Sequence, residues 1–143
     1  MQTINEIQQE IIDEFSIYDD WMDKYAFIIE QGNALQPIED KYKTPENIIK
    51  GCQSRVWLQT DYREGKLFFE AESDAIIVKG LLALVLRVFN GRTPDEIIGT
   101  DLRFMKEIGL TEHLSPTRSN GLLSVIKQIR YYAIAYKSKE DRN

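Results

Sequence analysis

The chain has 143 residues, a length that fits one domain and is sufficient to bury a sizeable hydrophobic core. Hydrophobic residues make up 43% of the chain and charged residues 29%, which is typical of a folded globular domain and argues against disorder over most of its length. The net charge is −5 and the sequence contains no polybasic run, so binding to nucleic acid is not expected.

Residues 1–32 predict two helices. Thr3 and Glu6 have the spacing of a capping box, and the apolar residues after it recur at helical spacing (Ile4, Ile7, Ile11 and Phe15). Asp19 or Asp20 can cap the second helix, in which Trp21, Tyr25 and Ile28 share one face, and Gly32 is a plausible end. These helices carry much of the negative charge, because residues 1–50 hold 11 acidic and 4 basic side chains, a net charge of −7.

A β-hairpin is predicted over residues 54–72. After a connection over 33–43, Thr44-Pro45-Glu46-Asn47 opens a short helical turn that Gly51 ends. From Ser54 the chain alternates apolar and polar residues, turns at 63–66, and alternates again. One face of this hairpin holds Val56, Leu58, Thr60, Leu67, Phe69 and Ala71.

The remaining residues predict helices. Ser73 or Asp74 can cap a helix over 75–90, which is apolar nearly all round and therefore belongs at the centre of the domain. Two short helices follow, one after a Thr93–Glu96 capping box and one over 101–107. A last helix opens at Ser115-Pro116, and its inner face has Leu122, Val125 or Ile126, Ile129 and Ala133. The predicted class is α+β, a small antiparallel sheet packed against helices in one domain over 1–143, with a polar, disordered end within 137–143.

Cys52 is the only cysteine, which excludes an internal disulfide and a cysteine-rich metal site. An unpaired cysteine is often a small buried hydrophobe, but Cys52 stands in a polar, flexible Gly-Cys-Gln-Ser junction. A free thiol has a pKa of about 8.5, and a helix that precedes the thiol does not lower this value. Activation would have to come from Lys50, Arg55, Arg118 or a bound partner.

Other residues carry weaker signals. His113, the only histidine, could act as a base for Cys52 in a thiol hydrolase, although a loop histidine with no special role is the more economical interpretation. Asp74 is accounted for by helix capping. Glu70 and Glu72 share a strand face, which is more typical of a solvated hairpin face than of paired catalytic carboxylates. Arg118 opposes the dipole of the last helix, which indicates a partner such as an anion or a backbone carbonyl.

Three segments together resemble the SufE family of sulfur-acceptor proteins. They are GCQSRVW (51–57), ESDAIIVKGLLAL (72–84) and LSPTRSNGL (114–122), in this order and spacing, and the resemblance extends to about residue 135. Each segment is a weak signal alone, but the three in register are specific. The resemblance implies an α+β fold related to that of IscU-type scaffolds.

The resemblance also implies a function. SufE-type proteins take sulfane sulfur from the persulfide of a pyridoxal-phosphate cysteine desulfurase of the SufS type, stimulate that enzyme, and pass the sulfur to an iron–sulfur scaffold of the SufBCD type. Cys52 would be the acceptor nucleophile, with Gly51, Gln53 and Ser54 shaping its loop and Asp74 and Arg118 supporting the loop or the partner surface. Such a protein is an accessory sulfur carrier rather than a stand-alone enzyme, and no cofactor or metal of its own is implied.

Alternatives remain open at this point. They are a thiol hydrolase using Cys52 and His113, a non-catalytic adaptor in which Cys52 is merely buried, and a SufE-like carrier that serves molybdenum-cofactor or tRNA sulfuration. The acidic N-terminal segment does not resemble a targeting peptide, and the apolar stretch at 80–88 is too short to span a bilayer, so a cytoplasmic protein without membrane contact is expected.

Overall fold

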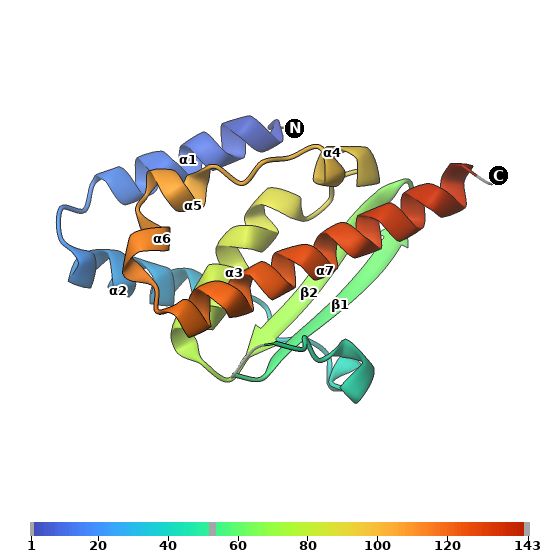
Figure 1. The fold of residues 1–143 in the computed structure, drawn as a ribbon, viewed down its shortest axis with the longest axis horizontal. Coiled ribbons are helices and arrows are strands. Elements are labelled where there is room, and N and C mark those ends of the chain that lie inside the picture. Colours follow the sequence, from blue (N-terminus) through green and yellow to red (C-terminus); the bar gives the residue numbers. More distant parts are fainter. Residues whose placement is uncertain (1, 52–53, 142–143) are drawn as a thin grey trace.

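The computed structural model describes residues 2–51 and 54–141. These residues form a two-stranded antiparallel sheet packed against helices, which is the predicted α+β class (Figure 1). The strands are β1 (Val56–Arg63) and β2 (Lys66–Ser73). The helices are α1 (Ile4–Ser16), α2 (Trp21–Asn33), α3 (Ile76–Phe89), α4 (Pro94–Ile98), α5 (Phe104–Glu107), α6 (Leu110–His113) and α7 (Pro116–Asp141), with single 3-10 turns η1 (Asp40–Tyr42) and η2 (Pro45–Asn47).

The hairpin pairs Val56 with Ser73 at one end and Arg63 with Lys66 at the other, close to the predicted bounds. Glu64 and Gly65 form its turn with φ values of 53° and 77°. Two successive residues with positive φ give the turn geometry that suits the right-handed twist of a hairpin. One face of the sheet, including the wholly buried Leu58 and Leu67, packs into the core.

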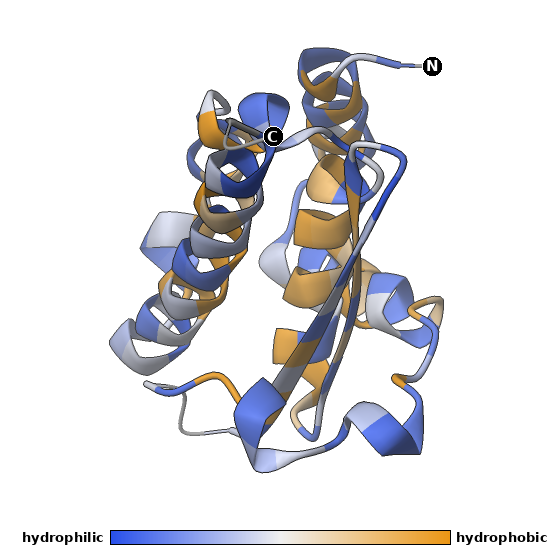
Figure 2. Cartoon of the chain, turned by 90° about the vertical axis from the view of Figure 1, so that its right-hand side faces the viewer, coloured by the Kyte–Doolittle hydropathy of each residue, from blue (hydrophilic) through white to orange (hydrophobic). Residues whose placement is uncertain are grey.

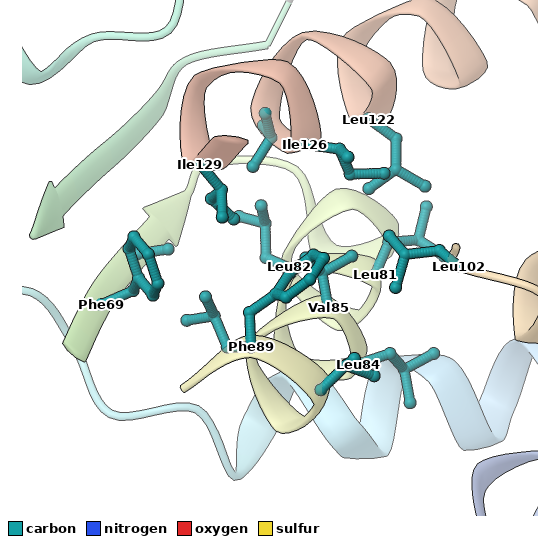
Figure 3. Close-up of a cluster of buried hydrophobic side chains, with 14 of the residues drawn as sticks. Phe69, Leu81, Leu82, Leu84, Val85, Phe89, Leu102, Leu122, Ile126 and Ile129 are labelled. Atoms are coloured by element: carbon teal, nitrogen blue, oxygen red, sulfur yellow. The ribbon is translucent and has the colours of Figure 1, made fainter. Parts of the chain in front are cut away.

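Helix α3 lies at the centre of the molecule, as its apolar sequence predicts. Figure 2 shows its ribbon almost wholly in the hydrophobic colour. Figure 3 shows residues of α7, among them Ile126 and Ile129, facing Leu82 and Val85 of α3 beside Phe69 of β2. All five side chains are at most 4% exposed, so a single core joins the hairpin to both helices.

Gly32 lies inside α2 and is not its end, which corrects the sequence prediction. A Cβ atom on Gly32 would come within 2.8 Å of the Gly80 nitrogen in α3, and one on Gly80 would come within 2.1 Å of the Ile28 carbonyl oxygen. Real Cβ atoms do not approach other atoms so closely. The two glycines therefore let α2 and α3 pack backbone against backbone, and α2 continues one residue further to Asn33.

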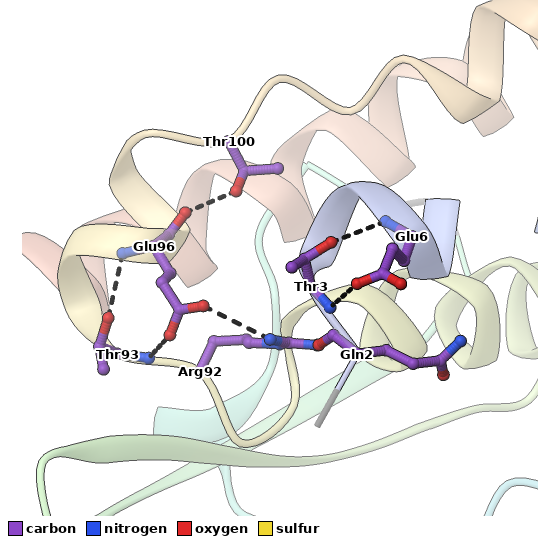
Figure 4. Close-up of polar contacts among 7 residues, drawn as sticks. All are labelled: Gln2, Thr3, Glu6, Arg92, Thr93, Glu96 and Thr100. Carbon is purple, nitrogen blue, oxygen red and sulfur yellow. Dashed lines mark hydrogen bonds and ion pairs between the residues drawn. The ribbon is translucent and has the colours of Figure 1, made fainter. Parts of the chain in front are cut away.

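Both predicted capping boxes are confirmed (Figure 4). The hydroxyl of Thr3 accepts a hydrogen bond from the Glu6 amide, and Thr93 and Glu96 repeat the arrangement at α4. Arg92, only 4% exposed, links the two caps, because its guanidinium donates to the Gln2 carbonyl oxygen at 2.6 Å and to the Glu96 carboxylate at 3.4 Å. The starts of α1 and α4 are thus fixed to each other as well as locally.

Of the two residues predicted as possible caps of α2, Asp20 is the cap, and its carboxylate accepts from the Met22 amide. The predicted helix over 101–107 forms only from Phe104, and a further short helix, α6, follows Gly109, whose φ is 86°. Helix α7 continues to Asp141, and residues 142–143, at the end for which the sequence predicts disorder, lie outside the described residues.

Candidate functional site

The segment 50–55, hereafter the Cys52 loop, is fixed at both ends. Cys52 and Gln53 lie outside the described residues, so the loop is defined by its neighbours. At its base the Ile49 amide donates to the Val56 carbonyl oxygen at 2.9 Å. Next to it, the Arg55 amide donates to a carboxylate oxygen of Asp74 at 3.1 Å, and the Asp74 amide donates to the Arg55 carbonyl oxygen at 3.3 Å. The loop is therefore tied to both strands.

Asp74 does not cap α3, which corrects its predicted capping role. The residue at the cap position is Ala75, and no side chain bonds the free amides of the first turn from there. Ser73 instead accepts from the Ala75 amide at 3.2 Å. The Asp74 carboxylate is thus directed to the Cys52 loop, which agrees with the supporting role that the family resemblance implies.

Gly51 has a φ of 94°, a conformation that side chains with a Cβ atom rarely adopt. A Cβ there would also lie 3.0 Å from the Ser124 hydroxyl oxygen of α7. The Cys52 loop therefore bends against α7 at a position that needs glycine.

A cavity of about 570 Å³ opens beside the described part of this loop. Its walls come from three parts of the chain. They are Ser54 and Val56 at the junction of the loop and β1, Ala75, Ile76, Ile77 and Val78 at the start of α3, and Ser115, Thr117, Arg118 and Gly121 at the start of α7. Each part belongs to one of the three segments that resemble the SufE family, so the fold brings these segments together around one cavity.

Arg118 is the only charged residue among the described residues that line this cavity. Its backbone amide donates to the Ser115 hydroxyl oxygen at 3.3 Å, so Ser115 caps α7. The Arg118 side chain is exposed, and its guanidinium has no hydrogen-bond or ion-pair partner in the part of the chain that the structure describes. A cation that lines a cavity can attract an anion, such as a thiolate or a persulfide.

The His113 side chain packs against α2 and does not line the cavity beside the Cys52 loop. Its ring stacks on the indole of Trp21 with the ring centroids 3.8 Å apart, and its Nδ1 lies 3.0 Å from the Gly109 carbonyl oxygen. The Tyr25 hydroxyl donates to the His113 carbonyl oxygen at 2.7 Å. His113 ends the helix α6 rather than lying in a loop, and it is not among the residues that line the cavity.

Glu70 and Glu72 have different surroundings, because one Glu70 carboxylate oxygen is buried without a hydrogen-bond partner among the described residues. Glu72 binds the Lys43 ammonium at 2.6 Å and accepts from the Ile38 amide at 3.2 Å, and its side chain is only 18% exposed. The hydrogen bond to Glu72 raises the pKa of Lys43 above its ordinary value. Glu72 therefore ties the connection after α2 to the hairpin instead of facing water, which corrects the expectation for this face.

The apolar wall from the start of α3 was missed as part of a site by sequence reasoning. Ile76 is 63% exposed there, which is unusual for a large apolar side chain in a helix that is otherwise buried. The only signal in the sequence was the place of Ile76 within the segment ESDAIIVKGLLAL.

No group of three or more histidine, cysteine, aspartate or glutamate residues able to hold a metal ion occurs among residues 2–51 and 54–141.

Comparison with known proteins agrees with this geometry. The sequence model of the SufE family, described as an Fe–S metabolism associated domain, matches residues 9–133. The chain belongs to the SufE family. Uncharacterized SufE-like proteins of Rhizobium etli and Rhizobium meliloti are each 45% identical to it over 126 residues, which cover 85% of this chain and 85% and 90% of theirs. Membership of the family places the chain in iron–sulfur metabolism.

A solved structure supports the fold. The solution structure of a hypothetical protein from Thermus thermophilus superposes with a TM-score of 0.76, covering 92% of this chain and 96% of the other at 16% identity. Because the sequence identity is only 16%, this similarity supports the fold and nothing about function. Among the described residues, no helix has the length and apolar character needed to cross a bilayer.

Proposed function

We propose that this SufE-family chain is a sulfur acceptor, in which Cys52 takes the terminal sulfur from the persulfide of a pyridoxal-phosphate cysteine desulfurase of the SufS type. It stimulates that enzyme and passes the sulfur to an iron–sulfur scaffold of the SufBCD type. The observation that carries the proposal is the single cavity beside the Cys52 loop, lined by all three family-like segments.

The transfer needs no outside oxidant or reductant. The Cys52 thiolate attacks the terminal sulfur of the donor persulfide, a new S–S bond forms on Cys52, and the old S–S bond breaks. The donor cysteine leaves as a thiolate, so atoms and electrons balance. In this proposal Arg118, the charged residue that lines the cavity beside the loop, would favour the thiolate before attack and the persulfide anion after it.

Gly51, Gln53, Ser54 and Asp74 would serve this step by holding the loop. The Asp74 carboxylate fixes the Arg55 amide, and Gly51 allows the bend against α7. Gln53, like Cys52, lies outside the described residues, and its role rests on the resemblance. In this proposal the chain is an accessory protein that requires no cofactor or metal ion of its own, and it acts in the cytoplasm.

The position of His113 favours a sulfur acceptor over a thiol hydrolase. A hydrolase would need an imidazole beside Cys52, whereas the His113 ring is stacked on Trp21 and bonded near Gly109. A carrier for molybdenum-cofactor or tRNA sulfuration would use the same chemistry with another recipient.

The test is sulfur transfer in vitro. We expect that incubation with cysteine and a SufS-type desulfurase adds the mass of one sulfur atom to Cys52, and that Cys52→Ser abolishes both the adduct and the stimulation. Ser138→Ala is the control, since it removes an exposed hydroxyl near the end of α7, outside the residues that line the cavity, and keeps the thiol. If Cys52 stays unmodified beside an active desulfurase, the proposal fails. If Cys52→Ser keeps full stimulation, the chain is an adaptor with a structural cysteine.

A further inference from the structure

The outer side of α7 carries an exposed apolar and basic surface. It consists of Leu123, Lys127, Tyr131 and Ile134 of α7 together with Ile48 of the segment before the Cys52 loop, and we refer to it as the α7 stripe. Leu123, Tyr131 and Ile134 are 58%, 54% and 49% exposed. Figure 1 shows α7 lying across the front of the molecule with no other element over it.

Two hollows flank this surface. One, of about 530 Å³, lies between α7 and residues 45–50 and is lined by Ile48, Lys127 and Tyr131 among others. The second, of about 440 Å³, lies on α7 itself between Leu123 and Ile134. Hollows between exposed apolar side chains are suited to receiving the side chains of a protein partner.

The charge of the surface defines the partner. Lys50 and Lys127 line the two hollows, and Glu46 is the only acidic residue among the described residues that line them. Arg130 lines the second hollow too, but its guanidinium donates to the Thr100 carbonyl oxygen at 2.8 Å. The Lys127 ammonium lies 5.8 Å from the Tyr131 ring centroid, so the cation is held over the apolar surface. A complementary surface would have an apolar centre with carboxylates around it.

The α7 stripe is continuous with the Cys52 loop, because Ser124 of α7 lies next to Gly51 and also lines the first hollow. From Ser124 to Ile134 the helix rises by about 15 Å. A stable protein interface covers about 800 Å² on each partner, and a round patch of this area has a radius of about 16 Å. A partner centred on Cys52 would therefore cover part of the α7 stripe.

We propose that the sulfur-donating desulfurase docks on the α7 stripe through an apolar patch rimmed by carboxylates. This inference rests on the proposed function. The donor is the occupant because Cys52 acts as the nucleophile only in the donor complex, and the sequence next to it gives the thiol no strong activation of its own. The contact with the α7 stripe holds the loop at the donor persulfide while the reaction occurs.

Two other occupants fit less well. An anionic membrane would be attracted by Lys50 and Lys127, but it would repel a chain whose net charge is −5. A second copy docked through the same surface would bring equivalent lysines together across the two-fold axis, which is unfavourable.

The test compares two charge reversals on exposed lysines. Lys127→Glu lies in the α7 stripe, and Lys66→Glu lies at the hairpin turn as the matched control. We expect Lys127→Glu to weaken the Kd for the desulfurase roughly tenfold at low salt, and Lys66→Glu to leave it within about twofold. Leu123→Gln should weaken the Kd with little dependence on salt. At saturating desulfurase, both α7 variants should still load one sulfur on Cys52.

Each outcome is decisive. An unchanged Kd for Lys127→Glu and Leu123→Gln overturns the docking proposal, while sulfur loading of the wild-type chain leaves the proposed function standing. Absence of loading in the wild-type chain overturns the proposed function instead. Unchanged donor affinity with lost transfer to the scaffold would assign the surface to the recipient and reject the donor. The docking proposal would also be rejected if the only effect of Lys127→Glu were the loss of binding to phosphatidylserine vesicles. The same holds if its only effect were the loss of a dimer in sedimentation.

Discussion

Arg55 and Asp74, 19 residues apart in the chain, bond each other twice, through the Arg55 amide to the Asp74 carboxylate and through the Asp74 amide to the Arg55 carbonyl oxygen. The pair extends the hairpin beyond its last strand residues, Val56 and Ser73. It thus carries the order of the sheet into the Cys52 loop. The carboxylate bond is the part that a side-chain substitution can remove.

Asp74→Ala should loosen the Cys52 loop without unfolding the protein. Asp74 is exposed, so the lost bond is worth about 1 kcal/mol, and the Arg55 amide should exchange its hydrogen roughly fivefold faster. Hydrogen exchange followed by NMR measures this rate. Asp74→Asn keeps an acceptor oxygen and should have a smaller effect. Equal exchange rates in Asp74→Ala and wild type would mean that the carboxylate does not hold the loop.

Arg118→Gln should raise the pKa of the Cys52 thiol. The guanidinium is the only charged group among the described lining residues of the cavity beside the loop, and a nearby cation favours the thiolate. The pH dependence of Cys52 alkylation reports this pKa, and its midpoint should move to higher pH in the variant. Arg55→Gln, a change of the same charge at an exposed loop residue, is the control. A midpoint that moves only with Arg55 would transfer the role to that residue.

Gly80→Ala should destabilise the fold by about 3 kcal/mol, because the new methyl group would collide with the Ile28 carbonyl oxygen and push α2 from α3. Urea unfolding followed by circular dichroism measures the free energy of unfolding. Gly99→Ala is a suitable comparison, since Gly99 has helical dihedral angles and its nearest contact is 3.2 Å to the Asp95 oxygen. It should cost about 1 kcal/mol or less. Similar losses in both variants would argue against backbone-to-backbone packing.

The capping box at α4 should contribute to acid sensitivity. The hydrogen bond from the Thr93 amide holds the pKa of Glu96 below its ordinary value of 4.5, against a smaller opposing effect of burial. Because the folded state has the lower pKa, this stabilisation is complete above pH 4.5 and is lost as the pH falls through the folded value. We expect its size to be at most about 1 kcal/mol, since solvent screens the carboxylate.

Glu96→Gln removes the titrating group. Between about pH 6 and pH 3, roughly the range in which carboxyl groups titrate, the free energy of unfolding should therefore fall less in the variant than in the wild type. Glu64→Gln at the hairpin turn is the control, because no hydrogen bond or ion pair of its side chain occurs among the described residues. The same pH dependence in Glu96→Gln and wild type would contradict the expectation.

The features that the sequence predicted well are local. The Thr3 and Thr93 capping boxes depend on residues three positions apart, and the hairpin depends on alternation and a turn with positive φ. Gly32 was misjudged because the same residue can end a helix or permit close packing, and only the position of Gly80 decides between them. Asp74 was misjudged because the amide that competes for its carboxylate belongs to Arg55, which lies before β1 and 19 residues earlier in the chain.

The candidate site was predictable only in part. Cys52 and Arg118 were proposed from their chemical type and from the family resemblance, and Cys52 itself lies outside the described residues. The meeting of Arg118 with Ser54 and the start of α3 is a tertiary result, which requires that α7 lie across α3 and beside the hairpin. The exposed side of α7 has no motif, since leucine, tyrosine and isoleucine in a helix ordinarily predict burial.

The cavity beside the Cys52 loop has one wall from the hairpin, one from α3 and one from α7, and α7 is also a main packing partner of the core. A peptide that carries residues 51–57 would have the thiol but neither Arg118 nor the apolar wall from α3. Removal of residues 114–141 would expose Leu82 and Val85 to water and would take Arg118 with it. If the proposed function holds, the sulfur-accepting site could not be grafted onto another scaffold as a short motif, because its cavity is built by the whole folded chain.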